Sequence, residues 1–106
     1  MERSGSTFNP PADPGAGVGP VLVRGPLSAA VLRALVELNP GLTSVDRGAY
    51  LRVSTPRRCV LSRAAVERHL GGPFRLPADL EGIMPSFKGR LSLSEDEAVW
   101  EEAPVR

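Results

Sequence analysis

Apolar and polar residues alternate most clearly in the middle of the chain. Ala49, Leu51 and Val53 are separated by more polar neighbours, which is the period of a strand with one buried face. Residues 54–57, with the sequence STPR, predict a turn because proline fixes φ and has no N–H to donate to a sheet. Residues 59–61 then return to an apolar, extended pattern. The pattern therefore predicts a β-hairpin at the centre of the chain.

A helix is predicted directly after this hairpin. Ser62 is a residue type that caps helix N-termini, and Ala65, Val66 and Leu70 follow at helical spacing. The run Gly71-Gly72-Pro73 ends the helix, since glycine favours the left-handed cap and proline cannot continue the turn. The centre of the chain is thus a hairpin followed by an amphipathic helix.

Further elements are predicted on either side of this centre. They are a strand over residues 18–23, a helix over 27–38, a short strand over 43–46, a strand over 87–93 and a last strand over 98–102. Residues 75–85 are predicted to be irregular, with Leu80, Ile83 and Met84 filling the core from a loop.

The strand over residues 87–93 alternates, so that Phe87, Gly89, Leu91 and Leu93 are expected on one face, turned toward the core. Glycine inside a strand weakens it and needs a reason. Two reasons are open for Gly89: the close approach of a partner's backbone, or a β-bulge.

The order of elements, β-α-β-β-β-α-β-β, predicts an α+β fold with two helices packed on a mostly antiparallel sheet. The folded domain is expected to span residues 18–103. Residues 1–17 are rich in proline and glycine, and Phe8 is their only large apolar residue. Such a segment buries too little surface to offset its ordering entropy, so we expect a flexible tail. Phe8 is a candidate anchor if the tail becomes ordered on a partner.

Composition is that of an ordinary small domain. The chain has 106 residues, of which 42% are hydrophobic and 24% charged, with a net charge of +1. No apolar run approaches the ~20 residues that span a bilayer. The first residues lack the apolar core of a secretory signal, and one cysteine excludes an internal disulfide, so we expect a cytoplasmic protein. The small net charge argues against bulk binding to nucleic acid or to an anionic membrane.

Basic residues are unevenly distributed. Residues 24–90 hold eleven of the thirteen basic residues and only five acids, and twelve of the thirteen are arginine. A solvated surface with a compositional bias explains this pattern. An arginine-lined docking face is the alternative, because arginine is enriched at interfaces and forms bidentate pairs with carboxylates.

The residue inventory argues against an enzyme. His69 is the only histidine and Cys59 the only cysteine, so one chain cannot form a metal site with two or three histidines. Cys59 lies within a predicted strand and is expected to be a small buried hydrophobic residue. No phosphate-binding, dinucleotide-binding or nucleophile-elbow motif is present. We expect no catalytic residues, no cofactor and no metal.

Two other binding functions remain open. Tyr50, Arg52, Phe87 and Arg90 form a possible aromatic and basic platform of the kind that binds RNA. A small α+β module that binds a small ligand is the second alternative.

Several segments, taken in order, resemble one known family. They are GVGPVLVRG at residues 17–25, DRGAYLRV at 46–53, LSR at 61–63, LGGPF at 70–74 and SFKGRL at 86–91. Together they resemble the small regulatory (effector, or coupling) proteins of bacterial multicomponent diiron monooxygenases, and most closely those of the toluene and aromatic four-component systems.

This resemblance implies a cofactor-free subunit that binds the diiron hydroxylase of the same system. Such a subunit tunes the active-site geometry, the access of substrate and O₂, and the coupling of electrons to hydroxylation. We expect it to be monomeric when free and to bind neither nucleic acid nor membrane. The candidate partner-binding residues are Phe8, Gly17, Val18, Gly19, Pro20, Arg24, Arg52, Pro85, Ser86, Phe87, Lys88, Gly89 and Arg90.

Overall fold

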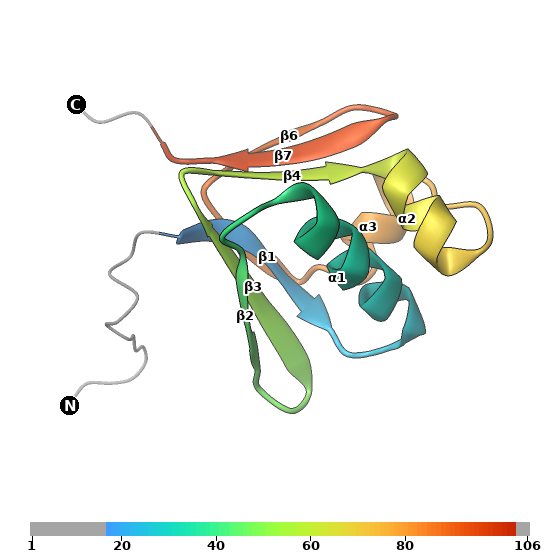
Figure 1. Ribbon diagram of the computed structural model, residues 1–106, viewed down its shortest axis with the longest axis horizontal. Coiled ribbons are helices and arrows are strands. Elements are labelled where there is room, and N and C mark those ends of the chain that lie inside the picture. Colours follow the sequence, from blue (N-terminus) through green and yellow to red (C-terminus); the bar gives the residue numbers. More distant parts are fainter. Residues whose placement is uncertain (1–16, 104–106) are drawn as a thin grey trace.

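The computed structural model describes residues 17–103, which form two antiparallel sheets and three helices (Figure 1). The first sheet has four strands in the order β2 (Thr43–Asp46), β3 (Tyr50–Pro56), β1 (Gly17–Val23) and β5 (Ser86–Lys88). The second has three strands in the order β4 (Arg58–Ser62), β7 (Glu97–Glu101) and β6 (Arg90–Leu93). The helices are α1 (Pro26–Leu38), α2 (Arg63–Leu70) and the single turn α3 (Ala78–Glu81). The predicted α+β class, with two main helices on antiparallel sheets, is confirmed.

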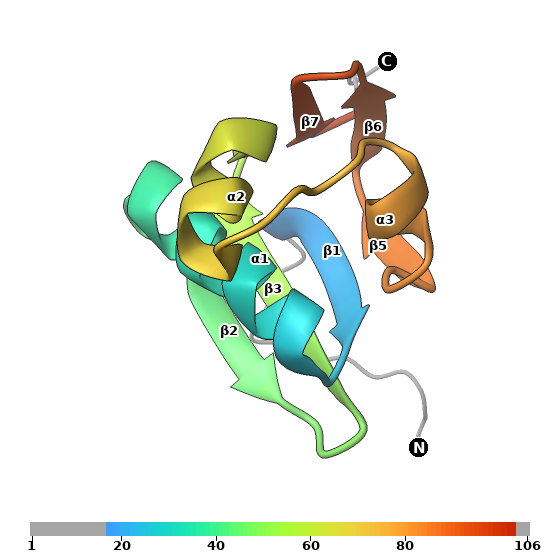
Figure 2. The same ribbon diagram turned by 90° about the vertical axis from the view of Figure 1, so that its right-hand side faces the viewer.

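Helices α1 and α2 lie together in the angle between the two sheets, whereas α3 sits apart from them beside β5 (Figures 1 and 2). Each main helix contributes an apolar side to the shared core, with Val31 and Leu35 from α1 and Val66 from α2 fully buried. Trp100 on β7 is also fully buried. None of the helices within residues 17–103 is long and apolar enough to cross a membrane.

The ends of the main helices follow the local signals in the sequence. Ser62 accepts a hydrogen bond from the backbone N–H of Ala65 at 3.3 Å, which caps α2, and Gly71 closes the helix with a left-handed φ of 77°. Asn39 ends α1 and ties it to the second sheet. Its side-chain amide donates to the carbonyls of Leu35 and Val60 and accepts from the N–H of Val60, each at 2.8 Å.

The predicted central hairpin is wrong. β3 and β4 do follow one another closely, but they belong to different sheets, because β3 pairs with β1 and β4 pairs with β7. Only Arg57 separates them, and its φ of 66° turns the chain out of one sheet and into the other. The Thr55 hydroxyl holds this corner by donating toward the carbonyls of Val18 at 3.3 Å and Arg58 at 3.0 Å.

The single strand predicted over residues 87–93 is also wrong. It is two strands, β5 in the first sheet and β6 in the second, joined at Gly89 with a φ of 104°. Phe87 is therefore not a core residue, and its side chain is 44% exposed. Leu91 packs against the core, whereas Leu93 is 37% exposed.

The segment between α2 and β5 is more ordered than predicted. Residues 75–85 were expected to be irregular, but they include the helical turn α3. Leu80 and Met84 are buried and Ile83 packs against the core, so the predicted core contribution of this segment is confirmed.

Candidate partner-binding groove

The outer face of the four-stranded sheet is hollowed into a groove of about 370 Å³. We call it the β1 groove, because β1 forms its floor and β3 and β5 form its walls. It is lined by Gly17, Gly19, Val21, Arg52, Val53, Ser54, Ser86, Phe87 and Lys88.

The floor strand β1 has two glycines, Gly17 and Gly19, at positions where β3 approaches closely. A Cβ at Gly17 would lie 1.5 Å from the Ser54 hydroxyl oxygen, and one at Gly19 would lie 2.6 Å from the Val53 carbonyl oxygen. Gly19 also has a φ of 149°, a conformation that side chains disfavour. The close packing of β3 on β1 therefore requires both glycines.

The intervening residues of β1 turn the other way. Val18, Pro20 and Leu22 are buried, whereas Val21 is half-buried and Val23 is 39% exposed. This alternation is the period of two in a strand, and it separates a core face from a groove face.

The walls of the groove carry positive charge. Arg52 on β3 pairs in register with Val21, which pairs on its other side with Ser86 of β5. Lys88 pairs with Gly19, which is two residues before Val21 on β1. Arg52 and Lys88 thus lie on opposite walls, offset from each other by two residues of β1. No lining residue is acidic.

Arg24, Arg58, Arg63 and Arg68 form ion pairs within residues 17–103, and the two groove cations do not. The Arg24 guanidinium pairs with the Asp46 carboxylate, Arg58 pairs with Glu101 at 3.3 Å, and Arg63 pairs with Asp96 at 3.0 Å. Among the described residues, neither Arg52 nor Lys88 has a carboxylate partner in an ion pair. The groove therefore presents net positive charge on its walls.

Apolar side chains continue the groove face along the sheet. Val45 and Tyr50 are each 45% exposed, which is high for residues of this size. Phe87 is 44% exposed, but it pairs with Pro20, so its side chain lies on the opposite face of the sheet. Tyr50 pairs in register with Val23, and Val45 pairs with Arg52. The outer face of the sheet therefore combines a polar, basic groove with an apolar border.

The β1 groove brings together six of the residues predicted to bind a partner. Gly17, Gly19, Arg52, Ser86, Phe87 and Lys88 all line it. These residues come from three segments of the sequence, and only the pairing of β3, β1 and β5 places them side by side.

The other predicted residues lie elsewhere. Val18 and Pro20 are buried in the core, and Arg24 pairs with Asp46 beyond the end of β1. Pro85, Gly89 and Arg90 are exposed residues that flank β5 without lining the groove. Phe8 lies outside the described residues.

Sequence reasoning missed three lining residues. Val21 follows Gly17 and Gly19 at a spacing of two, so strand alternation alone would have found it. Ser54 was assigned to a turn, but it lies within β3. The side chain of Val53 is buried, and its carbonyl oxygen faces Gly19.

Neither Cys59 nor His69 lines the groove. Cys59 on β4 is fully buried, and this burial raises the pKa of its thiol to about 11. The ring of His69 on α2 contacts the Glu37 carboxylate of α1 at 2.8 Å, and Arg68 pairs with the same carboxylate at 3.0 Å. Cys59 and His69 therefore do not form a catalytic pair. Within residues 17–103, no group of three or more potential metal ligands comes together.

Comparison with known proteins gives the chain a family. Residues 16–101 match the model of the MmoB/DmpM family. The chain is 46% identical over 85 residues to the effector subunit of the alkene monooxygenase system of Xanthobacter autotrophicus strain Py2, and the match covers 78% of this chain and 83% of that relative.

Two solved structures of a phenol hydroxylase–regulatory protein complex contain a chain with the same fold. The first superposes with a TM-score of 0.75 over 82% of this chain and 99% of that one, and the second with 0.69 over 80% and 98%. Both are 22% identical to this chain, so the likeness is one of fold. The family match and the identity to the alkene monooxygenase effector together show that this chain belongs to the MmoB/DmpM family.

Proposed function

We propose that this protein is the non-catalytic effector subunit of a multicomponent monooxygenase and that it acts by binding the hydroxylase. The observation that carries this proposal is the 46% identity to a monooxygenase effector subunit, over 83% of that relative's length. The residue inventory supports it. With one histidine and one buried cysteine, the chain itself has no ligand set for an oxygen-activating metal.

A subunit without reacting groups changes a reaction only through its binding energy. An effector shifts its partner between two states by as much as it prefers one of them. A preference of about 1–3 kcal/mol changes an equilibrium five- to 150-fold. The rigid two-sheet scaffold, with its core side chains buried, provides a surface of fixed shape for that preference.

The outer face of the four-stranded sheet is the docking face in this proposal. It combines exposed apolar side chains, arginine and lysine, and a concave floor. Protein interfaces favour aromatic and arginine residues around a desolvated centre. We further propose that residues 18–103 act as one unit, and that Phe8 contributes to docking.

An RNA-binding function is not favoured. The platform considered for it needs Tyr50, Arg52, Phe87 and Arg90 on one sheet, but Arg90 begins β6 in the second sheet. The aromatic and basic residues are therefore divided between two surfaces.

The sequence and the comparisons bear on whether the partner hydroxylase oxidises aromatic compounds or alkenes. The sequence segments resemble effectors of toluene and aromatic systems, whereas the relative at 46% identity serves an alkene monooxygenase system. We propose a hydrocarbon hydroxylase as the partner, of the aromatic class. Parallel assays of the reconstituted hydroxylase with toluene and with propene distinguish the two classes, and a preference for propene would overturn the finer proposal.

A binding experiment tests the function directly. The full chain is titrated into its hydroxylase and complex formation is followed by sedimentation velocity, with bovine serum albumin in place of the hydroxylase as control. We expect a saturable complex with the hydroxylase and none with albumin. A hydroxylase that never sediments with this chain would contradict the proposal.

A further inference from the structure

Building on the proposed function, we propose that the β1 groove receives an extended, acidic segment of the hydroxylase, with one carboxylate held between Arg52 and Lys88. The proposal assigns the groove a ligand chemistry, and it distinguishes the groove from the apolar border around it.

The shape of the groove fits an extended chain. Its floor is a strand, its two walls are the neighbouring strands, and strands in a sheet are about 4.8 Å apart, so the walls stand about 10 Å apart. One extended segment can lie along the floor within that spacing. The volume of about 370 Å³ holds a few side chains.

The charges of the groove specify a carboxylate. Arg52 and Lys88 lie diagonally across the floor, with their Cα atoms roughly 12 Å apart by strand geometry. Both side chains are long, so they can converge on one anion above Gly19. Arginine binds a carboxylate with two parallel hydrogen bonds, and lysine adds a point charge.

The remaining polar groups also suit a peptide. Ser54 and Ser86 place hydroxyl groups on opposite walls, where they can donate to or accept from a backbone. Val21, half-buried in the floor, gives an apolar surface for a neighbouring side chain. A nucleic acid would need many more cations, because its affinity comes from contacts with several phosphates.

A feature of the sequence makes this proposal directly testable. Lys88 is the only lysine of the chain, so the chain has one side-chain amine, and it lies in the groove. A carbodiimide joins an amine to a carboxylate only where the two are in contact, forming an amide with loss of water. Treatment of the complex of full chain and hydroxylase should therefore link Lys88 to one aspartate or glutamate of the hydroxylase, identified by mass spectrometry.

Charge variants provide the matched controls. Lys88→Arg keeps the positive charge and removes the amine, so we expect it to lose the cross-link and to bind the hydroxylase more tightly than Lys88→Glu does. Lys88→Glu and Arg52→Glu should each weaken binding at least tenfold, because each places a like charge against the carboxylate. Arg33→Glu, an exposed reversal on α1, should bind as the unmodified chain does.

Filling the groove without altering its charge gives an independent test. Ser86→Trp places a large side chain in the groove, whereas Ser92→Trp makes the same change on the exposed surface of β6. We expect Ser86→Trp to weaken hydroxylase binding at least tenfold and Ser92→Trp to leave it unchanged. Thermal melts of both variants establish that they are folded.

The outcomes separate this inference from the proposed function. Normal hydroxylase binding by Lys88→Glu and Ser86→Trp, with no cross-link from Lys88, would overturn the groove assignment and leave the effector function standing. A cross-link from Lys88 to an acid of the chain's own first sixteen residues, or to a second copy, would also overturn it. If the unmodified chain does not bind the hydroxylase at all, the proposed function fails first and this inference with it.

Discussion

Gly89 shows at the scale of one residue how the fold depends on a missing side chain. It joins β5 to β6 with a φ of 104°, and a Cβ there would lie 2.7 Å from the Glu101 carbonyl oxygen and 2.9 Å from Val18 Cγ1. The close neighbours are thus backbone and core of the chain itself. The fold alone accounts for this glycine, so a partner's backbone is not needed to explain it.

Gly89→Ala is expected to lower the free energy of unfolding by about 1–3 kcal/mol, because it adds backbone strain and a clash with Glu101. Gly41→Ala is the matched control. Gly41 also has a positive φ, 88°, but nothing lies within 4 Å of its added Cβ, so only the strain applies. Urea unfolding of both variants measures the difference, and equal losses would contradict the proposed clash.

Cys59 makes stability depend on alkaline pH. Burial raises the pKa of its thiol from 9.0 to about 11 in the folded state, so the unfolded chain loses this proton first. The contribution is fully present below pH 9 and is lost as the pH rises from 9 toward 11. We expect Cys59→Ala to show a smaller fall in unfolding free energy over that interval. If the unfolding free energies of the two proteins fall in parallel between pH 9 and 11, the Cys59 thiol is not the cause of the pH dependence.

The same burial protects Cys59 from reagents, because the thiolate is the reactive form and the side chain is inaccessible. Iodoacetamide at pH 8 should leave the native chain unmodified and alkylate it rapidly in urea. Rapid alkylation without urea would contradict the buried position of Cys59.

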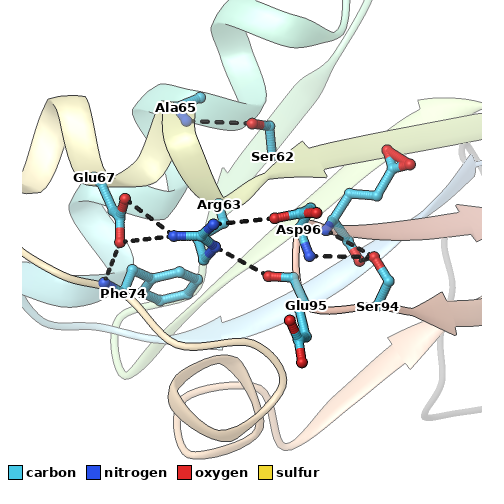
Figure 3. Close-up of polar contacts among 9 residues, drawn as sticks. Ser62, Arg63, Ala65, Glu67, Phe74, Ser94, Glu95 and Asp96 are labelled. Carbon is cyan, nitrogen blue, oxygen red and sulfur yellow. Dashed lines mark hydrogen bonds and ion pairs between the residues drawn. The ribbon is translucent and has the colours of Figure 1, made fainter.

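At the scale of elements, one arginine links α2 to the turn between β6 and β7 (Figure 3). Arg63 donates to the Glu95 carbonyl and to the Asp96 carboxylate, each at 3.0 Å, and pairs with Glu67 at 3.3 Å. Glu67 in turn accepts a hydrogen bond from the backbone N–H of Phe74 at 3.0 Å. This network fixes the first turn of the helix against the second sheet.

Arg63→Ala is expected to lower the free energy of unfolding more than Arg58→Ala does, because several bonds are lost together. Arg58→Ala is the matched control, since Arg58 makes one exposed ion pair, with Glu101, and such pairs contribute about 0–1 kcal/mol. Denaturant unfolding compares the two. A larger loss for Arg58→Ala would contradict the assigned role of the network.

The elements themselves were predictable from the sequence, but their pairing was not. Capping residues and apolar periodicity are local, and they placed α1, α2, β1 and β2 within one residue of their observed ends. The partner of a strand is a non-local choice. β3 and β4 each satisfy their hydrogen bonds with a strand far away in sequence, β1 and β7, and nothing near Arg57 indicates that.

The failure at residues 87–93 has the same origin. Alternation continues across Gly89 because β5 and β6 are each regular strands, and the change of sheet at Gly89 leaves that alternation intact. Phe87 was consequently assigned to the core, although it lines the β1 groove.

At the scale of the whole molecule, the core and the outer face of the four-stranded sheet have different roles. The core between them and the helices gives rigidity, while the outer face of the four-stranded sheet carries the groove, its cations and its apolar border. Six of the nine lining residues of this candidate site were predicted, from segments that resemble the family. Their convergence on one groove follows from the sheet order, which the sequence does not show.

The central claim is that the chain contributes binding and no chemistry. Its most direct measurement is the product formed per NADH consumed by the reconstituted hydroxylase, reductase and ferredoxin, with and without this protein. We expect the ratio to rise on addition of the chain, to fall back with Lys88→Glu and to stay high with Lys88→Arg, while the chain alone consumes no NADH. An unchanged ratio at saturating protein, or turnover by the purified chain alone, would contradict the account.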